Sequence, residues 1–146
     1  MTYVVNKKAH FDYEILEKFV GGIELLGFEV KSIKNNQGSL LGAYVAVRGG
    51  EAFLMGADIP PYQVKNTPES YERNRVRKIL LTKKEIKTLA DAEGKKGTTI
   101  IPISLFPKAN KIKIEIGIAR GKKKFDKRES IKKRDSEREI RREIKS

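Results

Sequence analysis

The side chains that most often carry catalysis are scarce in this sequence. Its 146 residues include a single histidine, His10, and no cysteine. Thiolate nucleophiles and zinc clusters are therefore excluded, as is a metal site built on two histidines. Glu29 and Asp58 are the least surface-like carboxylates, so a metal-dependent nuclease using this pair is the enzyme alternative. Because no spacing of carboxylates distinguishes an acid from a base, we expect no catalytic residue, metal, cofactor or small-molecule substrate.

Positive charge is concentrated toward the end of the chain. The sequence holds 32 Lys or Arg against 19 Asp or Glu, a net charge of +13, and residues 120–146 contain 13 of these basic and six of these acidic residues. This surplus predicts a polyanionic partner, with nucleic acid first and an anionic membrane surface second. No apolar stretch approaches the roughly 20 residues that span a bilayer. Without a secretory leader or cysteines, we expect a cytoplasmic protein that binds RNA and no membrane.

Basic residues form three clusters. They are Asn6 with Lys7 and Lys8, then Arg73, Arg75, Arg77 and Lys78, and finally the root of the tail at Lys122, Lys123 and Lys124. The alternate spacing of Arg73, Arg75 and Arg77 would direct three guanidinium groups to one side of an extended segment, where each can bind phosphate oxygens. The alternative is a solvated edge strand that its charges protect from aggregation.

The tail contains one aromatic residue, Phe125, which has no apolar neighbour. Stacking on an unpaired base is worth roughly 1 to 3 kcal/mol, so we expect Phe125 to contact RNA. The alternative is that it packs the root of the tail onto the folded domain. The rest of the tail is polar, and pairs such as Glu129 and Lys133 add only about 0.2 to 0.5 kcal/mol to a helix. The tail is therefore expected to be disordered when free and helical when bound.

Hydrophobic periodicity predicts strands, one hairpin and short helices. Phe11–Leu25 has period two and predicts a long strand, with a bend or bulge at Gly21-Gly22, although a helix is the competing interpretation. Gly27–Asn35 is predicted to be one short helix or a turn. Ala43–Arg48 and Glu51–Ala57 are apolar runs separated by two glycines, which is typical of a tight hairpin.

The second half of the chain predicts one helix followed by two strands. Thr82 and Glu85 form a capping box, which predicts a helix from Lys83 to Ala92. Thr98–Phe106 is rich in β-formers, and residues 112–118 alternate isoleucine with more polar residues, as in a half-buried strand.

Five or six antiparallel strands would leave exposed edges unless the sheet closes. We therefore predict a mainly β fold, a small OB-like antiparallel barrel with one to three short helices. The barrel occupies residues 1–119, and the basic tail occupies residues 120–146.

Four sequence motifs follow one another along nearly the whole chain. They are Asn6-Lys7-Lys8-Ala9, Gly27-Phe28-Glu29-Val30-Lys31-Ser32, Arg75-Val76-Arg77-Lys78-Ile79-Leu80-Leu81 leading into Lys84-Glu85-Ile86, and Ala119-Arg120-Gly121-Lys122-Lys123 through Asp126-Lys127-Arg128. In this order they resemble the SmpB family, the bacterial proteins that bind transfer-messenger RNA (tmRNA). The resemblance implies an OB-like barrel that binds the tRNA-like domain of tmRNA and delivers it to stalled ribosomes. This rescue pathway is trans-translation, and family members perform no covalent chemistry in it.

The resemblance also implies roles for individual residues. The implied tmRNA-facing surface comprises Asn6, Lys7, Lys8, Arg75, Lys78 and Leu80, with Lys122 and Lys123 at the root of the tail. The implied ribosome-sensing motif, which reads the decoding site and the empty mRNA channel, comprises Phe125, Asp126, Lys127 and Arg128. The expected partners are therefore tmRNA and the ribosome with its rRNA.

One departure from the family pattern concerns Val20. Many members carry a glutamate that contacts RNA in a Phe-Glu-Ala-Gly stretch, whereas this chain reads Phe19-Val20-Gly21-Gly22. Valine cannot accept a hydrogen bond, so that contact is either lost or made by another group.

The alternative to a rescue factor is a structural ribosomal protein whose basic extension is buried in rRNA.

Overall fold

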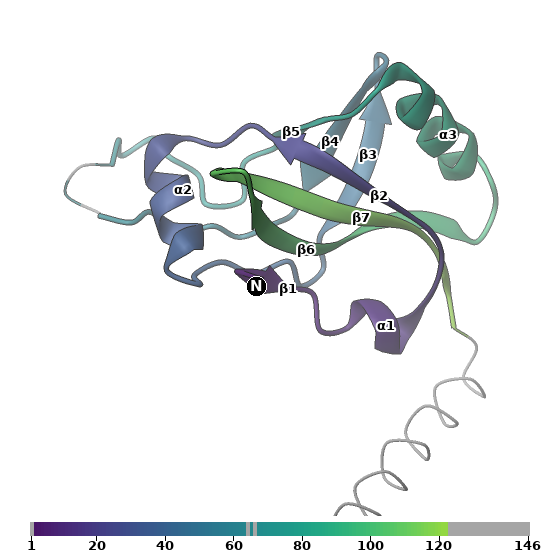
Figure 1. Cartoon of the computed structure of the whole chain (residues 1–146), viewed down its shortest axis with the longest axis horizontal. Coiled ribbons are helices and arrows are strands. Elements are labelled where there is room, and N and C mark those ends of the chain that lie inside the picture. Colours follow the sequence, from purple (N-terminus) through teal and green to yellow (C-terminus); the bar gives the residue numbers. More distant parts are fainter. Residues whose placement is uncertain (1, 64, 66, 123–146) are drawn as a thin grey trace, which may run out of the picture.

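The computed structural model describes residues 2–63, 65 and 67–122 (Figure 1). Over these residues seven strands form one antiparallel sheet in the order β1-β6-β7-β2-β5-β4-β3, accompanied by three helices. The strands are β1 (Val4–Val5), β2 (Tyr13–Ile23), β3 (Tyr44–Arg48), β4 (Glu51–Met55), β5 (Arg77–Leu80), β6 (Thr98–Lys108) and β7 (Lys111–Gly121), and the helices are α1 (Ala9–Asp12), α2 (Gly27–Lys34) and α3 (Lys83–Glu93). The prediction of a mainly β, antiparallel fold with one to three short helices is confirmed.

The hairpin of β6 and β7 forms one side of the core. Each strand has 11 residues, and the turn residues Ala109 and Asn110 have φ angles of 50° and 64°, as a tight hairpin with two left-handed residues requires. The isoleucines that alternate along β7 are all buried, as their period predicts. They are Ile112, Ile114, Ile116 and Ile118.

β2 pairs with β7 on one side and with β5 on the other. It covers most of the segment Phe11–Leu25, so the strand interpretation is confirmed over the helix, except that Phe11 and Asp12 belong to α1. The segment predicted as a short helix or a turn is the helix α2.

The two glycines of β2 have a different role from the predicted one. The bulge expected there is wrong, because Gly21 and Gly22 pair regularly with β7 and the irregularity lies within residues 15–17. A Cβ atom on Gly21 would lie 2.7 Å from Leu81 Cδ2 and 2.8 Å from the Leu80 carbonyl oxygen. Close packing between β2 and β5 therefore requires glycine at this position.

The hairpin of β3 and β4 and the start of α3 confirm two local predictions. The glycines between β3 and β4 have φ angles of 58° and 74°. At α3, Thr82 Oγ1 accepts a hydrogen bond from the Glu85 N–H at 3.2 Å, and Glu85 Oε1 accepts one from the Thr82 N–H at 3.0 Å. Each side chain thus satisfies a backbone donor of the first turn.

The sheet does not close into the predicted barrel. Across the described residues no ladder joins β3 to the opposite edge, where β1 pairs with β6 through only Val4 and Val5. The Val47 N–H of β3 donates instead to Glu93 Oε2 of α3 at 2.8 Å. A side chain therefore satisfies an edge donor that barrel closure would otherwise have used. β3 still lies beside β6, with α3 against both, so the sheet curls without closing.

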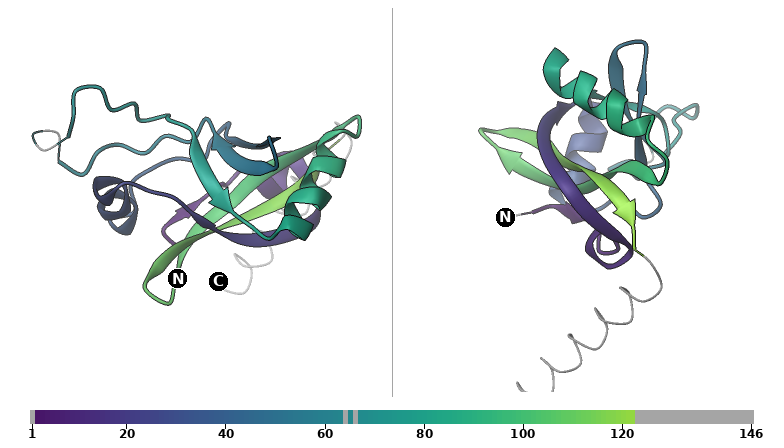
Figure 2. Two further views of the ribbon diagram at one scale, coloured as in Figure 1. Left: turned by 90° about the horizontal axis from the view of Figure 1, so that it is seen from above. Right: turned by 90° about the vertical axis from the view of Figure 1, so that its right-hand side faces the viewer.

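The segment between β4 and β5, residues 56–76, is a long loop that extends beside α2 (Figure 2). The rings of Phe28 in α2 and Tyr71 in the loop meet edge to face, with centroids 4.6 Å apart. In the part of the chain that the structure describes, no helix combines the length and apolar character needed to cross a membrane. The predicted helical behaviour of the tail lies outside the described residues.

Candidate RNA-binding surface

The two faces of β5 place alternate residues in opposite environments. Arg77 and Ile79 face inward and are buried, whereas Lys78 and Leu80 face outward. β5 is flanked by β2 and β4, so it is an interior strand of the sheet and not the predicted alternative of a solvated edge. The inward and outward faces form two distinct sites.

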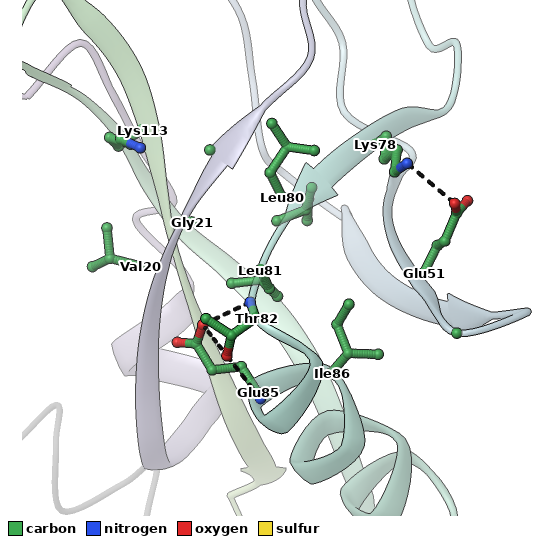
Figure 3. A pocket seen from close by; sticks show the side chains of 13 residues that line it. Val20, Gly21, Glu51, Lys78, Leu80, Leu81, Thr82, Glu85, Ile86 and Lys113 are labelled. Carbon is green, nitrogen blue, oxygen red and sulfur yellow. Dashed lines mark hydrogen bonds and ion pairs between the residues drawn. The ribbon is translucent and has the colours of Figure 1, made fainter.

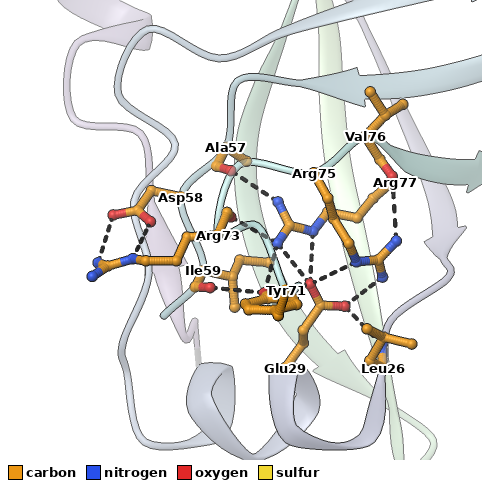
Figure 4. Close-up of polar contacts among 10 residues, drawn as sticks. All are labelled: Leu26, Glu29, Ala57, Asp58, Ile59, Tyr71, Arg73, Arg75, Val76 and Arg77. Carbon is orange, nitrogen blue, oxygen red and sulfur yellow. Dashed lines mark hydrogen bonds and ion pairs between the residues drawn. The ribbon is translucent and has the colours of Figure 1, made fainter. Parts of the chain in front are cut away.

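The inner site is a hydrogen-bonded network around the buried carboxylate of Glu29 in α2 (Figure 4). Arg77 donates to Glu29 Oε2 through Nε at 3.0 Å and through Nη2 at 2.6 Å. Arg75 donates to the same carboxylate through Nε and Nη2. The Tyr71 hydroxyl donates to Oε2 at 2.8 Å, and the Leu26 N–H donates to Oε1 at 2.7 Å. The network thereby joins the start of α2 to the end of the long loop.

The network fixes the protonation states of its acids. Burial alone raises the pKa of Glu29, but hydrogen bonds from Arg75, Leu26, Arg77 and Tyr71 outweigh it and lower the pKa from 4.5 to about 2. For Tyr71, burial and the bond to the Glu29 carboxylate together raise the pKa from 10.0 to about 12. At neutral pH the network therefore contains one carboxylate, two guanidinium ions and an uncharged phenol.

The prediction that three arginines point to one side as phosphate ligands is wrong. Arg77 is fully buried, and Arg75 turns toward Glu29. Arg73 forms a bidentate pair with Asp58, with bonds of 2.8 and 3.0 Å, and this carboxylate raises the pKa of Arg73. The geometry also gives the nuclease alternative no support, because arginines hold both of its carboxylates. Within residues 2–63, 65 and 67–122, no three acidic or histidine side chains gather as metal ligands.

The outer site is a hollow of about 550 Å³ between β2, β5 and the start of α3 (Figure 3). Leu80 and Val20 are exposed at its margin, and Lys113 of β7 reaches it from the other side. Lys78 Nζ lies 3.1 Å from Glu51 Oε1, in an ion pair that is exposed to solvent. Apolar side chains and two lysines thus stand on one open surface, which suits a nucleic acid strand.

A second group of predicted residues surrounds α1. The Asn6 side chain is buried, and its Nδ2 donates to the Pro102 carbonyl oxygen at 2.9 Å. Lys7 and Lys8 follow it on an exposed turn. Lys122 Nζ donates to the His10 carbonyl oxygen at 2.8 Å, which holds the root of the tail against α1. The structure therefore brings three predicted lysines together around α1. In Figure 1, α1 lies away from β5.

The predicted residues thus fall into three sets. Arg75, Lys78 and Leu80 lie at β5, and Asn6, Lys7, Lys8 and Lys122 lie around α1. Lys123, Phe125, Asp126, Lys127 and Arg128 lie outside the described residues.

Sequence reasoning missed several residues of the outer surface. The alternation along residues 112–118 predicts only that Lys113 lies on the polar face of a strand. No sequence pattern considered above identifies Phe53 or Val76 as part of an RNA-binding surface. In β4, Phe53 alternates with the buried residues Ala52 and Leu54 and therefore lies on the outer face of the strand. The period of two along this strand could have predicted that position. The position of Lys113 had no comparable signal, because the pairing of β7 with β2 brings it to the hollow.

The chain is similar to known proteins over its full length. The family described as SmpB protein matches residues 3–146. An SsrA-binding protein from Fusobacterium nucleatum is 47% identical over 146 residues, which cover all of this chain and 98% of that protein. One from Mesoplasma florum is also 47% identical, over 97% of this chain and 95% of that protein.

A solved structure agrees with these relatives. It is described as "tmRNA-SmpB: a journey to the center of the bacterial ribosome", and it superposes with a TM-score of 0.69 at 36% identity, covering 82% of this chain and 84% of that one. Together, the match over residues 3–146 and the full-length relatives show that the chain belongs to the SmpB family.

Proposed function

We propose that this chain binds the tRNA-like domain of tmRNA and delivers it to stalled ribosomes for trans-translation. The observation that carries this proposal is the 47% identity to an SsrA-binding protein over all 146 residues. The family is one of RNA-binding proteins without enzymatic activity, and the inventory of side chains agrees with that. The site of this function is the cytoplasm, where its two partners, tmRNA and the ribosome, are found.

The RNA-binding residues divide between the two surfaces described above. At β5, Leu80 supplies apolar contact and Lys78 supplies a cation. Arg75 lies in the loop two residues before the strand and supplies a second cation. Around α1, Lys7, Lys8 and Lys122 neutralise phosphates. Asn6 contributes by holding the start of the turn that carries Lys7 and Lys8 against β6.

The tail has a different function from the folded domain. Residues 120–146, with Lys123 at their root and the motif Phe125, Asp126, Lys127 and Arg128, sense the decoding site and the empty mRNA channel by folding there as a helix. Residues 1–119 form most of the tmRNA-binding domain, and β7 extends it to Gly121. We also infer that its curled sheet is an open variant of an OB-like barrel, in which side-chain packing of β3 against β6 takes the place of the closing ladder.

A binding experiment tests the tmRNA assignment. The chain is titrated against labelled tmRNA with unlabelled tRNA as competitor, at several salt concentrations. We expect tmRNA to be preferred and log K to fall steeply with log salt, because each neutralised phosphate contributes roughly −0.7 to −0.9 to the slope. A flat salt response, or equal competition by tRNA, would contradict the proposal. Uniform association with all ribosomes would instead support a structural ribosomal protein.

Truncation tests the division between domain and tail. Because β7 runs to Gly121 and the Lys122 N–H donates to the Asp12 carbonyl oxygen at 2.9 Å, the cut belongs after Lys122. We expect the shortened chain to keep most of its tmRNA affinity and to lose peptide tagging on stalled ribosomes. Retained tagging would refute a role for the tail.

A further inference from the structure

A second hollow opens beside β5, on the side away from α3. Its volume is about 470 Å³, within the range of small-molecule sites. It is lined by Glu24, Leu25, Leu26, Phe53, Arg75, Val76 and Lys78. Lys78 also lines the hollow around Leu80, so the two hollows share a margin. An RNA strand that follows the outer face of β5 would pass from one to the other.

The apolar part of this second hollow is unusually open to solvent. The side chain of Val76 is 48% exposed, and Leu26 is similarly exposed. Phe53 stands beside them on the outer face of β4, directly opposite Lys78 in the register of the two strands. An aromatic ring with aliphatic neighbours and an adjacent cation is the arrangement on which unpaired bases stack.

The positive charge of this hollow comes from the inner network. One carboxylate, Glu29, faces two guanidinium ions, and the Tyr71 phenol, whose pKa is raised to about 12, is uncharged at neutral pH. One positive charge is therefore left without a partner inside the network. Arg77 is fully enclosed, whereas the side chain of Arg75, which lines the hollow, keeps 29% of its surface exposed. Lys78 adds a second cation, which forms the exposed ion pair with Glu51, and Glu24 is the single acid of the lining.

We infer that this hollow binds one unpaired nucleotide of the bound RNA. Its phosphate lies at Arg75 and Lys78, and its base lies against Phe53, Leu26 and Val76. Apolar walls alone would also suit a protein segment, but the surplus positive charge of the inner network, exposed at Arg75, favours a ligand that carries an anion on each unit. The inference rests on the proposed function, because the nucleotide belongs to tmRNA.

Site-specific crosslinking tests what occupies the hollow. The photoreactive residue p-benzoylphenylalanine replaces Val76 in the full chain, and the same replacement at Leu41 is the control. Leu41 is 62% exposed and lines neither hollow. After irradiation with tmRNA and ribosomes, we expect position 76 to crosslink to an unpaired tmRNA nucleotide with a yield several times that of position 41. Crosslinks to protein alone, to a base-paired stem alone, or at equal yields would overturn the inference.

A charge substitution tests the same site by affinity. We expect Val76→Glu to weaken tmRNA binding about tenfold, because its carboxylate would lie beside the nucleotide phosphate, and Leu41→Glu to change it less than twofold. Thermal unfolding shows whether both variants keep their fold. Equal losses of tmRNA affinity in the two variants would overturn the nucleotide site, but they would not contradict the proposal that the chain binds tmRNA. If the unaltered chain does not prefer tmRNA over tRNA, the proposed function itself fails.

Discussion

The inner and outer faces of β5 use positive charge in opposite ways. Arg77 on the inner face has no exposed side-chain surface, and it donates to Glu29, to the Ala57 carbonyl oxygen and to the Arg73 carbonyl oxygen. Lys78, the next residue, keeps 37% of its side chain exposed and makes one solvent-exposed ion pair. Neighbours in one basic motif therefore serve different purposes, since the first holds the loop to α2 and the second remains available to a ligand.

The comparison shows that strand face and partner decide what a basic residue does. A buried guanidinium needs several acceptors and a carboxylate, and α2 supplies that carboxylate in a turn that Leu26 and Glu29 close together. An exposed lysine needs no such arrangement and gains little from its ion pair. Substitutions on the inner face should therefore change stability, and substitutions on the outer face should change RNA binding.

The largest effect is expected on the inner face, from Glu29→Gln. The amide keeps the shape but removes the negative charge, which leaves Arg77 buried as an uncompensated ion. We expect the free energy of unfolding to fall by about 3 to 5 kcal/mol, measured by urea denaturation. The matched control is Asp58→Asn, which breaks the exposed pair with Arg73 and should cost less than about 1 kcal/mol. Equal losses in the two variants would show that burial does not govern these pairs.

The same carboxylate predicts an acid dependence of stability. Because folding lowers the pKa of Glu29 from 4.5 to about 2, the ionised form is favoured in the folded state. Its contribution is complete above pH 4.5 and is lost as the pH falls toward 2, for a total of about 3 kcal/mol. Urea titrations between pH 7 and pH 2.5 should show the stability advantage over Glu29→Gln shrinking in this window. A constant difference would contradict the lowered pKa.

Local patterns allowed most elements of the fold to be predicted. The capping box of Thr82 and Glu85, the paired glycines at 49–50 and the isoleucines at 112–118 each determine a turn, a cap or a strand face through contacts between near neighbours. Barrel closure could not be judged in this way. It depends on whether β3 meets the far edge of the sheet, and Glu93, 46 residues from Val47, takes the donor involved.

The candidate site was less predictable for the same reason. Lys78 and Leu80 alternate with buried residues, so their outward positions follow from the strand period. The inward turn of Arg75 and Arg77 depends on Glu29, which lies 46 and 48 residues earlier in the chain. A basic cluster indicates a charge surplus, and only the long-range partner shows that Arg77 is fully enclosed while Arg75 stays partly exposed to a ligand.

The close contact between β2 and β5 gives a smaller effect. Gly21→Ala places a Cβ within 3 Å of a backbone oxygen, at 2.8 Å from Leu80 O, which cannot move without the strand. We expect a loss of about 1 to 3 kcal/mol in the free energy of unfolding. Gly22→Ala is the control, because its Cβ would meet only the Leu80 side chain, at 3.4 Å, and should cost less than about 1 kcal/mol. Equal costs would mean that strand conformation, and not packing, requires these glycines.

The smallest effect on stability, and the one that isolates the outer face, comes from Lys78→Gln. It breaks only the exposed pair with Glu51, so the free energy of unfolding should change by less than about 0.5 kcal/mol. If Lys78 contacts a tmRNA phosphate, affinity should fall several-fold and the salt slope should decrease by about 1. Arg48→Gln removes an equally charged residue from an exposed pair, with Glu93, on a strand that lines neither hollow. Lys78→Gln should therefore make the slope of log K against log salt shallower, whereas Arg48→Gln should leave it unchanged. Equal slopes in the two variants would show that RNA binding depends on the net charge of the protein and not on the outer face of β5.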